Sequence, residues 1–130
     1  MKIKQFIDLA IKEDIKDGDH SALACVPKQA KGSAKLLVKE AGIIAGVDIA
    51  KQIFNEFDSS FKFTSLINDG QSVQPGDIVF KINGPSRELL SAERLVLNVM
   101  QRMSAIATLT NKFVKELNGL NTKILDTRKT

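Results

Sequence analysis

The sequence contains no tryptophan and no tyrosine, and its aromatic residues are seven phenylalanines. A hydrophobic core built from it must therefore be mainly aliphatic. Single-stranded nucleic acids are usually bound by stacking their bases on aromatic side chains set among basic residues. Here the phenylalanines fall in apolar patterns instead. The net charge of +4 fits an anionic partner, but nucleic acid is not the partner that we expect.

Cysteine and histidine are nearly absent as well. A single cysteine, Cys25, excludes an internal disulfide and fits a reducing cytosol. With His20 as the only histidine, a site for a soft metal ion is disfavoured. No apolar run is long enough to span a membrane, and residues 1–10 carry Asp8 without a small-residue cleavage site. We therefore expect a cytoplasmic protein that does not associate with membranes.

The composition is otherwise that of an ordinary globular protein, with 43% hydrophobic and 26% charged residues. A length of 130 residues corresponds to one domain, or to one domain and part of another.

The strongest periodic pattern covers residues 86–118, where apolar residues recur at steps of three and four. This spacing predicts a helix that buries one stripe. Ser86 is a candidate cap at its start, and Gly119 is a candidate stop. Because one helix of this length is unusual in a small domain, we expect a break near Ser104 and Ala105.

Shorter patterns predict alternating helices and strands in the rest of the chain. Helices are expected at residues 2–14 and 47–57, and strands at 34–39, 61–66, 78–82 and 122–125. Glycines bracket the apolar residues 41–46 and suggest a bend or a close backbone approach. The last strand runs into charged and hydroxyl residues at 126–130, as strands do at the ligand-binding end of a barrel or sheet.

Two polar segments allow a second interpretation. Residues 14–21 are rich in aspartate, but Cys25 stands where a calcium loop needs its glutamate, so a turn with His20 on the surface is expected. Residues 69–77 resemble half of a biotinyl or lipoyl carrier module. The lysine that such a module needs at a hairpin tip is missing, and this binding-module interpretation is kept only as an alternative.

Six landmarks, taken in order, resemble the N-terminal part of quinolinate phosphoribosyltransferase. They are Glu13-Asp14 with Gly18-Asp19, Ile44-Ala45-Gly46, Asp69-Gly70 with Gly76-Asp77, Leu90-Ser91-Ala92-Glu93-Arg94 with Leu97-Asn98, Ser104-Ala105-Ile106-Ala107-Thr108, and Asp126-Thr127-Arg128-Lys129-Thr130.

The resemblance implies an α+β fold, with a small antiparallel sheet flanked by helices in an α/β-hammerhead-like arrangement, followed by the first strand of an α/β barrel. It divides the chain into a substrate-capping α/β domain, residues 1–103, and a connecting helix with the first strand of a truncated barrel, residues 104–130. Family members are dimers in which the N-terminal domain of one subunit closes the barrel mouth of the other, so a homodimer is expected.

The implied reaction belongs to NAD biosynthesis. Quinolinate and phosphoribosyl pyrophosphate, with Mg²⁺, give nicotinate mononucleotide, pyrophosphate and carbon dioxide. In the family, the Mg²⁺ ligands and most of the barrel come after the position of Thr130. We therefore expect these 130 residues to hold no metal of their own and to be inactive alone.

The resemblance also implies four site residues. Arg94 is similar to the arginine that reaches across the dimer to a quinolinate carboxylate. Arg128 and Lys129 resemble a catalytic pair at the end of the first barrel strand, where they face substrate carboxylates and phosphates. Thr127 resembles a neighbour that assists in binding. The chemistry is suitable, because an arginine fork binds a carboxylate through two parallel hydrogen bonds.

Two local departures accompany the resemblance. Ala105 stands where the family commonly has glycine, and Asp19-His20-Ser21 replaces an Asp-x-Thr pattern. Two alternatives stay open: a paralogous phosphoribosyltransferase-like protein that acts on another acid, and a non-catalytic dimerisation or binding domain in which Arg94 is a surface charge.

Overall fold

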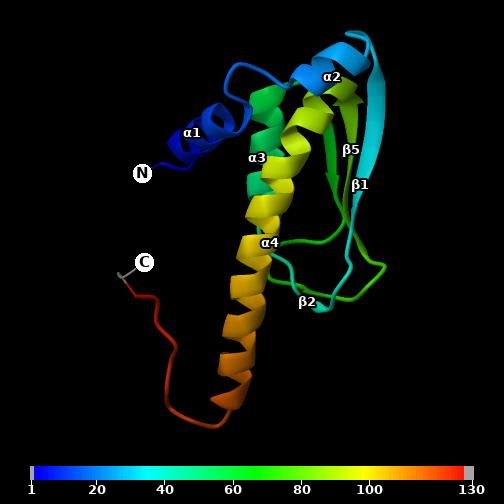
Figure 1. The fold of residues 1–130 in the computed structure, drawn as a ribbon. Coiled ribbons are helices and arrows are strands. Elements are labelled where there is room, and N and C mark those ends of the chain that lie inside the picture. Colours follow the sequence, from blue (N-terminus) through cyan, green and yellow to red (C-terminus); the bar gives the residue numbers. More distant parts are fainter. Residues whose placement is uncertain (1, 128–130) are drawn as a thin grey trace.

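The computed structural model describes residues 2–127 and has the predicted α+β fold (Figure 1). Its helices are α1 (Ile3–Ile15), α2 (His20–Cys25), α3 (Val47–Phe57) and α4 (Ser86–Glu116). Its strands are β1 (Lys31–Leu37), β2 (Gly42–Ile43), β3 (Lys62–Ser65), β4 (Ser72–Val73) and β5 (Ile78–Pro85).

The main sheet is antiparallel and has the order β1-β5-β3, while β2 and β4 form a separate two-stranded ladder. β5 is the central strand, and its residues Val79, Phe80 and Ile82 are almost fully buried, as expected for a strand covered by neighbours. Its register pairs Ala34 of β1 and Phe63 of β3 with the same residue, Ile82. Helices α3 and α4 lie together on one side of this sheet (Figure 1).

The core between the sheet and the helices is mainly aliphatic, as the composition predicts. Of its buried residues, only Phe54 and Phe80 are aromatic. Their rings join those of Phe61 and Phe63 in one cluster, with the centroids of Phe63 and Phe80 4.5 Å apart. These four phenylalanines thus fill part of the space between α3 and the sheet.

The predicted break in the long helix is wrong, because α4 runs without interruption from Ser86 to Glu116. Alanine is the best helix former, so Ala105 favours continuation of the helix. Ser104 directs its hydroxyl to the backbone of Ala45 instead of disturbing its own helix. Ser86 is also not the cap: Pro85 occupies that position, without a side-chain capping bond.

Two hydroxyl groups on α4 bind the segment that contains β2. The Thr108 hydroxyl accepts a hydrogen bond from the Ile43 N–H at 2.9 Å. The Ser104 hydroxyl accepts one from the Ala45 N–H at 3.0 Å and donates to the Ala45 carbonyl at 3.2 Å. Ser104 and Thr108 are four helical residues apart, a rise of about 6 Å, and Ile43 and Ala45 are two extended residues apart, a rise of about 6.6 Å. Because the two spacings match, the hydroxyl groups of α4 bind the edge of β2 as a neighbouring strand would.

The start of α3 is capped from a distant part of the chain. Its own capping residue is Gly46, which has φ +98° and no side chain to offer. The Asp69 carboxylate accepts hydrogen bonds from the N–H groups of Val47 at 2.8 Å and Asp48 at 3.3 Å. Three of the sequence landmarks, those around residues 45, 69 and 104–108, consequently meet at one place.

Two further predictions need correction. The strand expected at 122–125 is wrong, since residues 122–127 have no regular secondary structure. A strand is stabilised by hydrogen bonds to a neighbour, and within residues 2–127 no strand pairs with this segment. The turn expected around His20 is in fact the start of helix α2, although His20 is exposed as expected. The division at residues 103 and 104, which falls inside α4, stays a prediction.

The second half of α4 extends beyond the sheet and carries an exposed apolar face (Figure 1). In the first half, Ala92, Val96 and Met100 are at most 3% exposed. The exposed large apolar residues of the second half are Met103, Ile106, Leu109, Phe113 and Val114. In the part of the chain that the structure describes, no helix has both the length and the apolar character needed to cross a membrane.

The hydroxyl contacts of α4 lead to a stability prediction. Thr108→Val keeps the shape of the side chain but leaves the Ile43 N–H without its acceptor. We expect the free energy of unfolding to fall by about 1 kcal/mol, measured by urea denaturation. Thr110→Val, a change at an exposed position of the same helix, is the matched control and should shift it by less than about 0.5 kcal/mol. Equal effects of the two changes would contradict the role given to Thr108.

Candidate functional site

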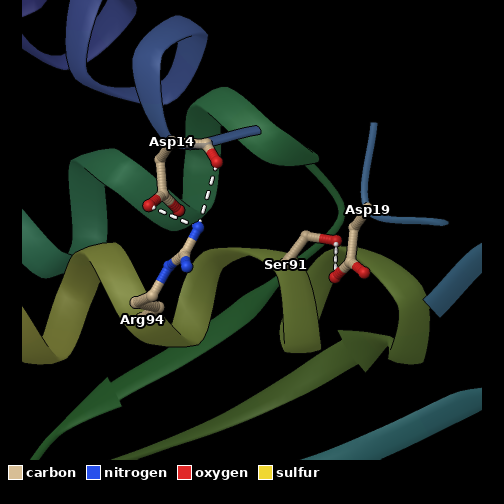
Figure 2. Close-up of polar contacts among 4 residues, drawn as sticks. All are labelled: Asp14, Asp19, Ser91 and Arg94. Carbon is tan, nitrogen blue, oxygen red and sulfur yellow. Dashed lines mark hydrogen bonds and ion pairs between the residues drawn. The ribbon is translucent and has the colours of Figure 1, made fainter. Parts of the chain in front are cut away.

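Arg94 and Asp14 form the centre of the candidate site (Figure 2). Nη2 of Arg94 lies 2.8 Å from Asp14 Oδ1 in an ion pair and donates a hydrogen bond to the Asp14 carbonyl oxygen at 3.0 Å. The Asp14 side chain is 19% exposed, whereas that of Arg94 is 68% exposed. The contact therefore joins the end of α1 to the outer surface of α4.

The same contact completes the C-terminal end of α1. The last four carbonyls of a helix have no partner within it. Here the carbonyls of Lys12 and Ile15 accept hydrogen bonds from the following turn, and the carbonyl of Asp14 accepts one from Arg94. The positive guanidinium also faces the negative end of the helix dipole, which is favourable.

A second carboxylate, that of Asp19, contacts α4 at Ser91, one turn before Arg94. The Asp19 carboxylate caps α2 by accepting a hydrogen bond from the Ala22 N–H at 3.0 Å, and it accepts another from the Ser91 hydroxyl at 3.0 Å (Figure 2). The Ala22 N–H, followed by the Ser91 hydroxyl, holds the pKa of Asp19 below its ordinary value. The nearby charge of Arg94 contributes in the same direction, so Asp19 stays ionised at neutral pH.

Arg87 is a member of this set that the sequence did not single out. Its Nε donates to the Val26 carbonyl at 2.6 Å, and its Nη2 donates to the Leu23 carbonyl at 3.0 Å. Arg87, Ser91 and Arg94 are spaced by four and three residues, which places them on one face of α4. This spacing could have identified Arg87 from the sequence. Polar residues that recur on one face of a helix whose other residues are mostly buried indicate contacts between that face and a neighbouring element.

Arg94 uses only Nη2 in its contacts, whereas Arg87 uses both Nε and Nη2. Its contacts with Asp14 both use Nη2, so the three N–H donors on Nε and Nη1 take no part in them. A shallow hollow beside it on α4 is lined by Leu90, Glu93, Leu97, Asn98 and Gln101. An exposed, fixed guanidinium of this kind is suited to bind an anion such as a carboxylate.

The other predicted site residues lie at the C-terminal end of the chain. Thr127 is exposed, and its N–H donates to the Asp126 carboxylate at 2.8 Å. Arg128 and Lys129 lie outside the described residues. The structure thus holds Arg94 on the upper half of α4 and Thr127 on the segment that follows its lower end (Figure 1).

Within residues 2–127, no group of three histidine, cysteine, aspartate or glutamate side chains is arranged to hold a metal ion. Asp14 and Asp19 are engaged by Arg94, Ser91 and the α2 backbone. We therefore assign none of the described residues to a metal ion.

Comparison with known proteins gives a consistent result. The family model described as "Quinolinate phosphoribosyl transferase, N-terminal domain" matches residues 11–104. A Nicotiana tabacum protein, quinolinate phosphoribosyltransferase [decarboxylating] 1b, is 43% identical over 98% of this chain and 36% of its own length. A probable nicotinate-nucleotide pyrophosphorylase [carboxylating] of Bacillus subtilis is 35% identical over all of this chain and 45% of its own.

The fold gives the same match. A crystal structure of NadC from Streptococcus pyogenes superposes with a TM-score of 0.94 at 35% sequence identity, over 98% of this chain and 46% of that one. The chain thus spans between about a third and a half of the length of the proteins that it matches.

The cap formed by Asp19 leads to a pH-dependent stability prediction. Asp19→Ala removes the acceptor for both the Ala22 N–H and the Ser91 hydroxyl and should lower the Tm at pH 7. Because the pKa of Asp19 is lowered in the folded state, its stabilising effect is present above the unfolded-state pKa and is lost as the pH falls through the folded one. The Tm difference from the unaltered chain should therefore narrow below about pH 4.

Thermal unfolding at pH values from 7 down to 3 measures this difference. Asp17→Ala is the control, because Asp17 is 83% exposed and pairs only with the exposed His20 in the described structure. A Tm difference for Asp19→Ala that is the same at pH 7 and pH 3 would contradict the assignment.

Proposed function

This chain belongs to the family of quinolinate phosphoribosyltransferase N-terminal domains, and from that membership we propose that it is the N-terminal part of such an enzyme. The complete enzyme would join quinolinate to phosphoribosyl pyrophosphate and release pyrophosphate and carbon dioxide, making nicotinate mononucleotide for NAD biosynthesis. The observation that carries the proposal is the agreement over 98% of this chain, at 43% identity, with a protein named for this activity.

In this proposal, Arg94 binds a carboxylate of quinolinate. Quinolinate is planar and doubly anionic, and a guanidinium binds a carboxylate through directed, charge-assisted hydrogen bonds. The free N–H donors of Arg94 and its position on the outer surface of α4 support this role. Neutralising one carboxylate also helps bring the pyridine nitrogen close to the ribosyl carbon.

Arg128 and Lys129 take the catalytic role, and Thr127 assists in binding. Two cations near the second carboxylate and the phosphates would stabilise the negative charge that develops during decarboxylation and pyrophosphate release. Mg²⁺ would bind with phosphoribosyl pyrophosphate through residues of the remainder of the enzyme, since the described residues offer no suitable ligand set. We propose a cytoplasmic location, supported by the lone Cys25.

We further propose that the enzyme is a homodimer in which Arg94 of one subunit reaches the active site of the other. The support is the exposed apolar face of the second half of α4, which includes Ile106, Leu109 and Phe113. An apolar face of this kind is more stable when another surface covers it. The remainder of the enzyme and a second subunit are the surfaces available in this proposal.

The first test concerns the isolated chain. These 130 residues alone should release no pyrophosphate from quinolinate and phosphoribosyl pyrophosphate above the background rate, because they span only about a third to a half of the enzymes that they match. A coupled pyrophosphate assay measures this. Appreciable turnover by the isolated chain would contradict the proposal that it is only a part of the enzyme.

The second test uses a joined enzyme, defined as this chain followed by the C-terminal remainder of its Bacillus subtilis relative. Arg94→Ala should lower kcat/KM for quinolinate about 10²-fold, because a charged donor to the substrate is lost. Arg102→Ala, at an exposed position on the same helix, is the control and should leave kcat/KM within about twofold.

The same assay separates the alternatives. A joined enzyme that turns over nicotinate but not quinolinate would indicate a paralogue acting on another acid. If Arg94→Ala has no more effect than Arg102→Ala, Arg94 is a surface charge and the proposed binding role is wrong.

A further inference from the structure

We propose that Asp14 is a positioning residue for Arg94: it holds the guanidinium where the substrate carboxylate meets it. The inference rests on the proposed function and adds to it a residue that does not touch the substrate. Its starting point is the double contact of Asp14 with Nη2, through Oδ1 at 2.8 Å and the backbone carbonyl at 3.0 Å.

The Asp14 carboxylate is not needed to complete the helix. It lies in the last turn of α1, where the helix dipole disfavours a negative charge and favours a positive one. Arg87 completes the end of α2 in a comparable way, by donating to two backbone carbonyls, those of Leu23 and Val26. An arginine can therefore complete a helix end without a carboxylate, so the Asp14 carboxylate must have another role.

The contact geometry supplies that explanation. Two oxygens of one residue hold a single nitrogen of Arg94, which fixes that end of the guanidinium group. The three N–H donors on Nε and Nη1 are left for a ligand, which they bind as separate donors because both parallel donor pairs of a guanidinium include Nη2. A long side chain that is 68% exposed otherwise samples many rotamers, and ordering it on binding costs affinity. Fixing it in advance reduces that cost.

Asp14 is itself fixed by the core. Ile7 of α1 is 1% exposed, and Ala10 and Ile11 of the same helix pack against the core. One turn before Arg94 on α4, the Ser91 hydroxyl donates a hydrogen bond to Asp19, which ties the segment after α1 to the same helix (Figure 2). Arg94 is consequently held by a residue of a helix that packs against the core.

The test uses steady-state kinetics of the joined enzyme with Asp14→Asn. This variant keeps the size of the side chain and the backbone carbonyl but removes the charge. We expect KM for quinolinate to rise about three- to fivefold, the size associated with one exposed ion pair, with kcat and KM for phosphoribosyl pyrophosphate nearly unchanged. Asp17→Asn is the matched control, because Asp17 contacts the exposed His20 and should leave all three constants unchanged.

A double-mutant cycle distinguishes positioning from a merely structural role. If Asp14 acts through Arg94, Asp14→Asn should have no further effect on kcat/KM in the Arg94→Ala background. An equal loss in both backgrounds would overturn the inference, because Asp14 would then act on the fold. A lower KM in Asp14→Asn would also overturn it, since Asp14 would then compete with the substrate for Arg94.

Failure of the proposed function has a different signature. A joined enzyme that does not turn over quinolinate, or one in which Arg94→Ala is silent, removes both the function and this inference. An active enzyme that needs Arg94 but is unaffected by Asp14→Asn overturns this inference alone.

Discussion

Polar side chains on one helix, α4, satisfy the backbone ends of the segments that pack against it. Arg94 completes the end of α1, Arg87 completes the end of α2, and Thr108 accepts from the backbone of β2. Buried or half-buried backbone groups without partners are costly, so each contact fixes where its segment lies along the helix. The positions of α1, α2 and the β2–β4 ladder therefore depend on where these polar residues lie along α4.

The elements with strong periodicity could be predicted from the sequence. Helix α3 begins and ends where the pattern predicts, and β5 was identified by its apolar run. Helix α2 was missed because it is only six residues long and is set by the cap from Asp19, which looks like a turn in the sequence. The strand at 122–125 was predicted from a short apolar pattern and from the family resemblance, but a strand also requires a neighbouring strand to pair with.

The candidate site was predictable only in part, for a similar reason. Resemblance to a family singled out Arg94, but its ion pair with Asp14 joins residues 80 positions apart and follows from no local pattern. Most of the landmarks that carried the resemblance turn out to hold the fold together: Asp69 caps α3, and Ser104 binds the backbone of Ala45. Such landmarks predict the fold more securely than the substrate, which depends on fewer residues.

The continuity of α4 has a mechanical consequence. A helix of 31 residues is about 46 Å long. Its upper half packs beside α3 on one side of the sheet, and its lower half extends beyond them (Figure 1). Because the helix has no break, the lower half acts as a lever arm about 23 Å long, so that a tilt of about 5° of the packed half displaces the far end by about 2 Å. A domain attached to that end would therefore move by a larger distance than the packed half of the helix does.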